Sequence, residues 1–381
     1  MSLHSKLLRL TDMLQMSKRR GLLDASRVAW NRYCYDHFTS GSLPVLCKTR
    51  PYCVQIETSR ACNLRCKMCE YSYRQDNGPT MRVDAFKTVL AQFPSVQSVD
   101  VTGIGEPFCN KDFLDIVRHA KSQGLYVVFS TNGNLFTEDI IQELIDIQVD
   151  QIRFSLDAAT KKTHEDIRRG SDFTRVTGAI ALLSRMVVQA GKSKPQRHIS
   201  YTISRENLDE APLIVNLARE LGVGGVTFLD LIVFQGGVYD TTARIDVASE
   251  GHMARIGEQI REAAEQTGVE VTTGQGLSMD RPPRMICMRP WMNAYVNVQG
   301  DLYPCCLVTQ RNEDTDKHKF GNLFVDRFDD IWNSTAYQTL REEMAHPTVV
   351  PQMCVGCKMV RKRSAVDLAS EARDAGAKAQ G

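Results

Sequence analysis

Three cysteines close together give this sequence its clearest chemical signal. Cys62, Cys66 and Cys69 are separated by three and then two residues. Three thiolates on one short loop can hold three irons of a 4Fe–4S cluster and leave the fourth iron with an open coordination position. Open positions are typical of catalytic metal sites, whereas structural sites are closed. For the trio alone, a zinc site with a fourth ligand elsewhere is the alternative.

A second set of cysteines lies further along the chain. Seventeen residues separate Cys287 from Cys305, Gly300 stands five positions before Cys305, and Cys354 and Cys357 form a close pair. Four thiolates from two such segments can close a tetrahedral zinc site or a full 4Fe–4S cluster. Spacing alone does not choose between these two metal centres.

Secondary-structure elements around the first cysteine set must hold it in place. From residue 51 onward, predicted strands alternate with predicted helices. The predicted strands are 53–58, 98–103, 125–130, 150–156, 197–203 and 225–231, and the predicted helices include 111–123, 138–148, 173–189 and 208–221. Strands separated by helices imply a parallel sheet with right-handed crossovers. On this pattern, a partial barrel and an open doubly wound sheet are both compatible with the sequence.

Ligand-binding residues follow the second predicted strand, in the stretch 103–107. Gly103 and Gly105 allow the backbone to approach a ligand closely, because they carry no side chain. The carboxylate of Glu106 can accept hydrogen bonds from an amino group. Folds with parallel strands bind ligands at the carboxyl ends of those strands, which is where this stretch lies.

Together, the cysteine trio after the first strand and the Gly-Glu-Pro loop after the second resemble the radical S-adenosylmethionine (SAM) family. The resemblance implies an α/β fold, a partial (β/α)6 TIM-like barrel, over residues 51–273. It also implies a 4Fe–4S cluster on Cys62, Cys66 and Cys69 whose open iron binds SAM. In that family an electron from the cluster cleaves SAM, and the resulting 5′-deoxyadenosyl radical removes a hydrogen atom from the substrate.

The resemblance also implies which residues contact SAM, at the ends of the first four strands. They are Met68, Gly105, Glu106, Pro107, Ser130, Asn132, Ser155 and Asp157. Met68 departs from the family, which often has an aromatic residue there; a thioether can fill the position by soft packing. The last four residues have an alternative role in capping loops and helices.

The second cysteine set resembles the SPASM/Twitch extension of the same family, over residues 274–360. The resemblance implies an auxiliary 4Fe–4S cluster on Cys287, Cys305, Cys354 and Cys357. Full SPASM domains carry two more cysteines after the last pair, and none follows here, so we expect one auxiliary cluster. Cys306 is then spare. It is either a buried apolar side chain, a thiol that donates a hydrogen atom, or an alternative ligand in place of Cys305.

Composition sets the remaining expectations. The chain is 43% hydrophobic with a formal net charge of +2, which gives no reason to expect a nucleic acid partner. Twelve cysteines without a secretory signal indicate metal ligation in the reducing cytoplasm. Residues 1–50 read as a basic helical extension packed on the barrel, with contact to a membrane surface as the less favoured alternative. Residues 361–381 are polar and are expected to be disordered.

The expected activity is oxidation by a radical SAM oxidoreductase. A dehydrogenase or epimerase acting on a carbinol carbon of a sugar, aminocyclitol or similar small molecule is favoured, with a flavodoxin- or ferredoxin-like electron donor. Arg153 is a candidate to assist deprotonation if it faces the barrel interior. The alternatives are a maturase of a ribosomally made peptide and a non-catalytic iron–sulfur or zinc protein that binds a partner.

Overall fold

The structure is a computed structural model of the chain. It describes residues 43–73, 78–233, 237–245, 250–273, 287–311, 315–346, 348–355, 357 and 360. The expectations for residues 1–42, for the linker after residue 273 and for the tail 361–381 therefore lie outside the described residues. Among the helices of the described ranges, none has the length and apolar character needed to cross a membrane.

The described strands form one curved sheet in the order β10-β9-β8-β1-β2-β3-β4-β5-β6-β7. Their bounds are β1 Cys53–Ile56, β2 Ser98–Asp100, β3 Tyr126–Thr131, β4 Gln151–Ser155, β5 Gln196–Ile203, β6 Gly225–Asp230, β7 Glu270–Thr272, β8 Asn293–Val296, β9 Asp301–Tyr303 and β10 Gly321–Asn322. The pairs from β8 through β1 to β7 are parallel, and only the β8–β9 and β9–β10 pairs are antiparallel. The expected parallel α/β fold is confirmed.

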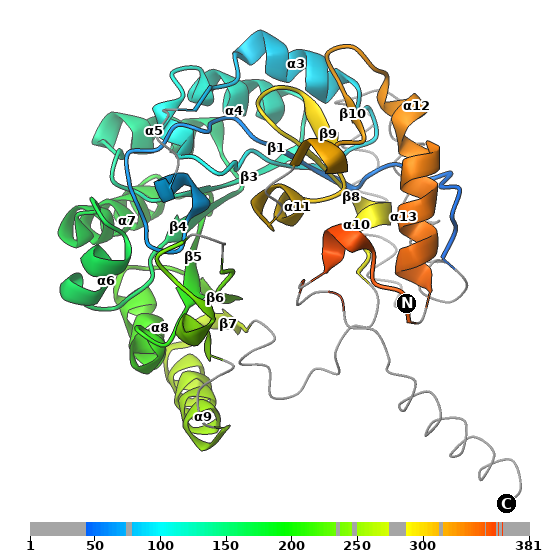
Figure 1. The fold of residues 1–381 in the computed structure, drawn as a ribbon. Helices are drawn as coiled ribbons and strands as arrows, with labels where there is room; N and C mark the ends of the chain where they lie inside the picture. The colour runs from blue at the N-terminus through cyan, green and yellow to red at the C-terminus, as the bar shows by residue number, and fades with distance from the viewer. Residues whose placement is uncertain are drawn as a thin grey trace, which may run out of the picture.

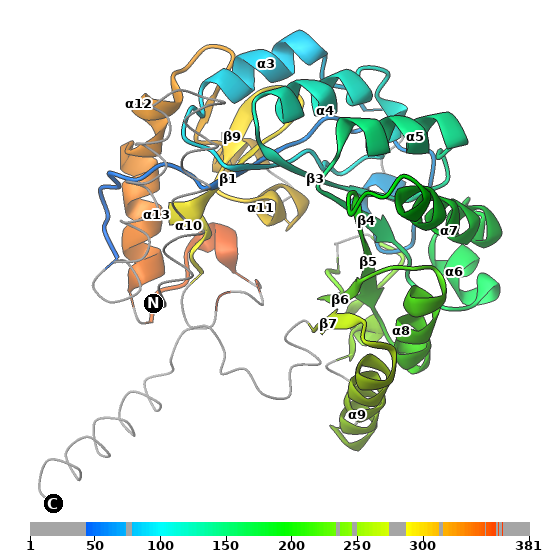
Figure 2. The same ribbon diagram turned by 180° about the vertical axis from the view of Figure 1, so that it is seen from behind.

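Helices cover the outer, convex side of this sheet (Figures 1 and 2). They are α3 Val83–Ala91, α4 Phe113–Ser122, α5 Glu138–Ile147, α6 Lys161–Ile167, α7 Phe173–Gln189, α8 Ala211–Glu220 and α9 Glu250–Thr267. Two begin at side-chain caps: Thr137 accepts from the N–H of Ile140, and Asp172 accepts from the N–H of Arg175. Such caps satisfy backbone donors that have no partner inside the helix.

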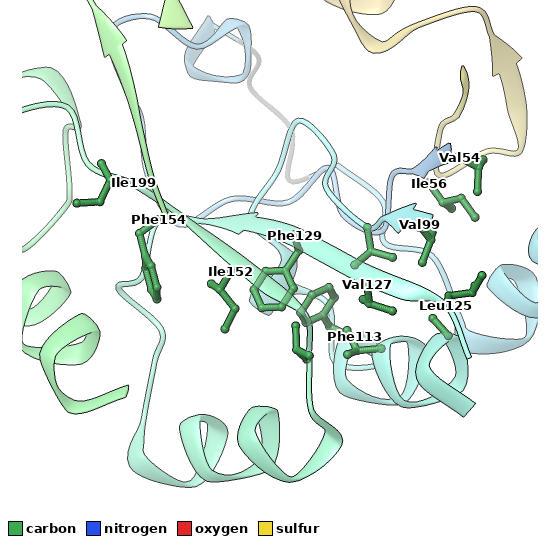
Figure 3. Close-up of a cluster of buried hydrophobic side chains, with 14 of the residues drawn as sticks. Val54, Ile56, Val99, Phe113, Leu125, Val127, Phe129, Ile152, Phe154 and Ile199 are labelled. Atoms are coloured by element: carbon green, nitrogen blue, oxygen red, sulfur yellow. The ribbon is translucent and has the colours of Figure 1, made fainter. Parts of the chain in front are cut away.

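The core lies between the sheet and these outer helices. Alternate residues of each strand point to it, such as Ile152 and Phe154 of β4, which have no exposed surface. Figure 3 shows them beside Phe129 and Val127 of β3, all pointing toward the helices. Because successive side chains on a strand point to opposite faces, Arg153 lies on the inner face of the sheet.

The sheet crosses the boundary predicted between the barrel and the second cysteine set. Strand β8 pairs in parallel with β1, with Cys53 opposite Asn293. The remaining C-terminal helices are α10 Arg289–Met292, α11 Cys306–Arg311, α12 Phe328–Trp332 and α13 Thr335–Ala345. Helix α11 lies on the inner, concave side of the sheet (Figure 1). The loop of the first cysteine set and the β8–β9 hairpin that leads to Cys305 therefore extend from one continuous sheet.

Helix α10 is held in place by a buried arginine. Arg341 has no exposed surface, and its Nε donates to the carbonyl of Pro290 at 3.1 Å. Its guanidinium stacks on the rings of Trp332 and Tyr337, at 4.4 and 4.9 Å from their centroids. These contacts fix α10, and with it the segment that follows Cys287.

Candidate functional site

The first cysteine set occupies the loop that follows β1. The N–H of Leu64 points to Cys62 Sγ at 3.5 Å, and the N–H of Cys69 donates to the carbonyl of Cys66 at 3.1 Å. Burial raises the pKa of the Cys62 and Cys66 thiols to about 11. Because a cluster binds thiolates, loading this site must displace protons.

The donor set and its surroundings fit a 4Fe–4S cluster. Cys62 has both Cys69 and Cys109 among its electrostatic neighbours, so the thiols share one small region. The thiolates of a cluster each bind a different iron. Cys62, Cys66 and Cys69 would hold such a cluster.

The glycine loop after β2 packs directly on the cysteine loop. The N–H of Gly105 donates to the carbonyl of Ser59 at 3.0 Å, and the N–H of Glu106 donates to the carbonyl of Ala61 at 2.8 Å. A Cβ at position 105 would lie 2.3 Å from the Ala61 carbonyl oxygen. Only glycine therefore fits at position 105, which explains why this residue type stands there.

The carboxylate of Glu106 is buried beneath this loop. It accepts hydrogen bonds from the Thr131 hydroxyl at 2.6 Å and from the backbone N–H of Asn132 at 2.8 Å. Burial raises the pKa of Glu106 to about 7, although these hydrogen bonds oppose the rise. Pro107 is buried and begins the 3-10 helix η2 Pro107–Cys109. The carboxylate is thus held in one orientation and titrates near neutral pH.

Other predicted SAM contacts lie around the same edge of the sheet. Ser130 and Ser155 are half-buried at the ends of β3 and β4, and Met68 is half-buried within the cysteine loop. Asn132 is buried, and its side-chain amide donates to Asn63 Oδ1 at 2.8 Å. The Asn132 side chain therefore connects the end of β3 to the cysteine loop.

Asp157 is placed differently from the predicted SAM contacts around it. Its carboxylate has no exposed surface and accepts the backbone N–H of Thr202 at 2.6 Å. The other oxygen, Oδ2, lies 2.6 Å from Nε of Arg168. Asp157 therefore forms an internal ion pair behind the cysteine loop, and both of its carboxylate oxygens have partners within the protein.

Two members of the second cysteine set, Cys287 and Cys305, lie near the partly buried Arg289. Cys287 interacts electrostatically with Cys305 and Cys357, and Cys305 interacts with Cys357 as well. Burial alone would lower the pKa of Arg289, but Cys306, Cys305 and Cys287 raise it. This donor set fits an iron–sulfur cluster, because four thiols with a fixed counter-charge can hold one closed centre.

Cys305 and Cys306 have different surroundings despite being adjacent. Cys305 has Cys357 among its electrostatic neighbours, whereas Cys306 has Asp100 on strand β2 of the barrel. Cys354, the fourth predicted ligand, packs against the hydrophobic core together with Cys287 and Cys357. Cys305 therefore belongs with the auxiliary set, and Cys306 lies between that set and the barrel interior.

The inner face of the barrel carries polar side chains between the two cysteine sets. Nη1 of Arg153 lies 2.9 Å from Oδ2 of Asp100. His198 stands opposite Arg153 in register, and its Nε2 lies 2.8 Å from the hydroxyl of Thr227. Burial, with Arg153 nearby, lowers the pKa of His198. The imidazole is therefore neutral at pH 7.

Sequence reasoning missed several of these residues. Arg168 and Arg289 gave no signal, because a single arginine after a helix or a cysteine is common. Glu57 did give one: it is a carboxylate directly after the predicted strand residue Ile56, and it is fully buried. Lys67 stands inside the cysteine loop and is paired with Asp166 at 2.6 Å. A charged residue within a stretch of buried residues indicates that the side chain has a specific partner inside the fold.

Comparison with protein families gives two matches along the chain. The family described as the radical SAM superfamily matches residues 56–189, and the SPASM family, described as an iron–sulfur cluster-binding domain, matches residues 287–358. The first range contains the cysteine trio and the glycine loop. The second contains the auxiliary cysteines. The two matches therefore fall on the two sites described above.

Curated relatives share about a quarter of their residues with this chain. A tungsten-containing aldehyde ferredoxin oxidoreductase cofactor-modifying protein of Pyrococcus furiosus is 25% identical, over 75% of this chain and 82% of the relative. An AdoMet-dependent heme synthase of Methanosarcina barkeri is 24% identical, over 81% and 91%. A mycofactocin maturase, MftC, of Mycolicibacterium smegmatis is 24% identical, over 77% and 73%.

Solved structures share the fold at lower identity. Streptococcus suis SuiB bound to S-adenosylmethionine has a TM-score of 0.61 at 16% identity, over 81% of this chain and 71% of SuiB. Native anSMEcpe with bound AdoMet has a TM-score of 0.59 at 18% identity, over 81% and 86%. The cofactors that these families imply are SAM, the 4Fe–4S cluster that binds it, and auxiliary iron–sulfur chemistry in the SPASM domain. The chain belongs to the radical SAM superfamily and is a radical SAM enzyme with a SPASM-type C-terminal domain.

Proposed function

We propose that this enzyme oxidises a carbinol carbon of a polar small molecule such as a sugar or an aminocyclitol. The polar side chains on the inner face of the barrel are the observation that supports this proposal. These half-buried side chains offer charged and neutral hydrogen-bonding groups: Gln55, Asp100, Arg153, His198 and Thr227. A substrate with several hydroxyl or amino groups can form additional hydrogen bonds with these side chains, whereas an apolar substrate would form none and would cover polar groups on binding.

The polar residues lie next to the edge where SAM is expected. Arg153 precedes Ser155 by two residues on β4, which corresponds to roughly 6.6 Å along a strand. Ser130, Arg153 and His198 stand side by side in the register of β3, β4 and β5. A substrate held by this row would lie just inside the SAM-binding edge, with Asp100 and Cys306 on the side of the second cysteine set.

His198 is the proposed base. A neutral imidazole can take the proton of the substrate hydroxyl, and Gly225 leaves space for its ring: a Cβ at position 225 would lie 2.4 Å from Cε1 of His198. When bound, SAM and its cluster supply the hydrogen-abstracting radical, and the auxiliary cluster supplies an acceptor for one electron. Removal of a hydrogen atom, a proton and an electron from H–C–O–H leaves a carbonyl, which balances the reaction.

The electron that starts SAM cleavage must come from outside the chain. We propose a one-electron carrier of the flavodoxin or ferredoxin class as the donor. Epimerisation is a variant of the same proposal, in which Cys306 returns a hydrogen atom to the substrate radical. The thiyl radical that this leaves would then take one electron, supplied by the external carrier through the auxiliary cluster, and one proton from solvent to restore the thiol. The position of Cys306 beside Asp100 supports this variant.

Peptide maturation is the second candidate function. One relative is a mycofactocin maturase, and SuiB and anSMEcpe have been solved with a precursor peptide, SuiA, and with the Cp18Cys peptide. These similarities favour a peptide substrate, and the polar inner face would also accommodate a peptide side chain. A co-expressed precursor whose mass changes by two hydrogens or by a crosslink would support this candidate.

The test uses the full-length protein after anaerobic reconstitution. It is incubated with SAM, dithionite and a panel of sugars and aminocyclitols deuterated at single carbinol carbons. The expected result is deuterium in 5′-deoxyadenosine and a carbonyl product without solvent hydrogen. One solvent hydrogen in the product indicates epimerisation instead. His198→Gln should still give deuterated 5′-deoxyadenosine but about tenfold less carbonyl product. No deuterium transfer from any carbinol substrate contradicts the proposal.

A further inference from the structure

Arg168 lies behind the first cysteine set, with its side chain 12% exposed, and faces two partners. Its Nε lies 2.6 Å from Asp157 Oδ2, and its Nη1 donates toward Cys66 Sγ at 3.9 Å. Asp157 is itself fixed by the backbone N–H of Thr202. The guanidinium therefore stands between an anchored carboxylate and a ligand of the SAM-binding cluster.

The backbone fixes this arrangement. The N–H of Arg168 donates to the carbonyl of His164 at 2.7 Å, at the end of α6. The cysteine loop runs along the same segment, because the N–H of Arg65 donates to Arg169 and that of Lys67 donates to Ile167, both at 2.9 Å. The guanidinium of Arg168 and the sulfur of Cys66 are thus held together by main-chain hydrogen bonds as well as by side chains.

We propose that Arg168 is a positioning residue that raises the reduction potential of the SAM-binding cluster, with Asp157 as its anchor. Reduction adds one negative charge to the cluster, and a fixed cation nearby stabilises the more negative state. Hydrogen bonds to the sulfurs and local charge are among the factors that set cluster potentials. The inference gives Asp157 a role through Arg168 that differs from a direct contact with SAM.

The test is a redox titration of both clusters, followed by electron paramagnetic resonance, on the reconstituted full-length protein. In Arg168→Gln the potential of the SAM-binding cluster should fall. At a fixed solution potential the ratio of reduced to oxidised cluster should drop about tenfold, which is 59 mV for a one-electron couple. Arg168→Lys keeps the charge and should shift the potential less.

Asp157→Asn separates an electrostatic role from general damage to the site. Removal of the negative charge should raise the potential of the same cluster, opposite in sign to the effect of Arg168→Gln. Arg289→Gln is the matched control, since Arg289 lies among the auxiliary cysteines. It should change the auxiliary signal and leave the SAM-binding cluster unchanged.

Two results would overturn the inference. One is an unchanged potential of the SAM-binding cluster in Arg168→Gln, and the other is a shift of the same sign in Arg168→Gln and Asp157→Asn. If Arg168→Gln fails to assemble the cluster, the Arg168→Lys and Asp157→Asn titrations decide. The titration needs no substrate, so its outcome is independent of the proposed oxidation of a carbinol carbon.

Discussion

Glu57 Oε1 accepts a hydrogen bond from the backbone N–H of Ile104 at 2.9 Å. Oε2 of the same carboxylate accepts from the N–H of Val298 at 3.3 Å and lies 3.4 Å from Nε of Arg60. Ile104 belongs to the glycine loop, and Val298 follows β8 of the C-terminal domain. One fully buried carboxylate therefore connects the glycine loop to the hairpin that leads to Cys305.

Replacement of Glu57 by Gln should destabilise the fold. The amide has the same shape but turns one acceptor into a donor, so a buried backbone N–H loses its partner at a cost of about 1–3 kcal/mol. Urea unfolding of the full-length chain measures this change. Glu265→Gln, at an exposed site on α9, is the matched control and should change stability by less than about 0.5 kcal/mol. Equal effects in the two variants would show that the buried carboxylate is dispensable.

Replacement of Gly105 by Ala should disrupt the site. The added Cβ would meet the Ala61 carbonyl at 2.3 Å, so the glycine loop or the cysteine loop must move. We expect a loss of about 1–3 kcal/mol of stability and at least a tenfold drop in SAM cleavage, measured as 5′-deoxyadenosine per reconstituted cluster.

Gly178→Ala in α7 is the matched control for Gly105→Ala. A Cβ at position 178 would meet no atom within 4 Å. The substitution should therefore leave cleavage unchanged and add about 0.5–1 kcal/mol of stability, because alanine favours the helix more than glycine does. Normal cleavage by Gly105→Ala would refute the close packing of the two loops.

SAM binding should depend on pH through Glu106. Its folded pKa of about 7 lies above the ordinary carboxyl value of 4.5, so the protonated form stabilises the fold, and that contribution disappears as the pH rises through about 7. We predict that Glu106 binds the amino end of SAM, and the carboxylate is the form that can accept its N–H groups. Affinity for SAM should therefore increase about tenfold from pH 6 to pH 8, measured by calorimetry.

Glu106→Gln isolates this carboxyl from the titration of SAM itself. The amide cannot ionise, so only the pH dependence of the SAM amino group should remain. The difference between the wild-type and variant slopes gives the contribution of Glu106. Identical slopes in the two proteins would exclude Glu106 as the titrating group.

The auxiliary cysteines can be separated by iron content. Two 4Fe–4S clusters give about eight irons per chain, and Cys305→Ala should reduce this to about four. Cys306→Ala, the adjacent control, should keep about eight, because Cys305 and not Cys306 is the predicted ligand and Cys306 also has Asp100 of the barrel among its electrostatic neighbours. Iron and zinc are measured by elemental analysis after anaerobic reconstitution. Zinc in the C-terminal site, or loss of iron in Cys306→Ala, contradicts the assignment.

Much of this architecture could be predicted from local patterns. The six predicted strands all occur, with bounds that differ by up to three residues, because apolar alternation is a local property of the chain. The predicted helix 173–189 is found with the same bounds as α7. The cysteine spacing and the Gly-Glu-Pro loop indicated the family for the same reason, since each is a short contiguous stretch.

Long-range pairing could not be predicted from one sequence. Ser155 and Asp157 looked alike as polar residues after a strand, but Arg168 draws Asp157 into an internal ion pair. Asn132 likewise finds its partner, Asn63, on a distant loop. Nothing in the local sequence distinguishes a polar side chain that faces a ligand from one that meets a buried partner, because the partner is set by the fold.

The pairing of β8 with β1 has a consequence for the order in which the chain folds during synthesis. Strand β1 forms near the start of the barrel, but one of its edges stays unpaired until residues 293–296 have left the ribosome. An open strand edge can pair with other chains, and contacts between distant segments form slowly. Expression at low temperature or with chaperones should therefore raise the soluble yield, and truncation before β8 should leave a barrel that aggregates.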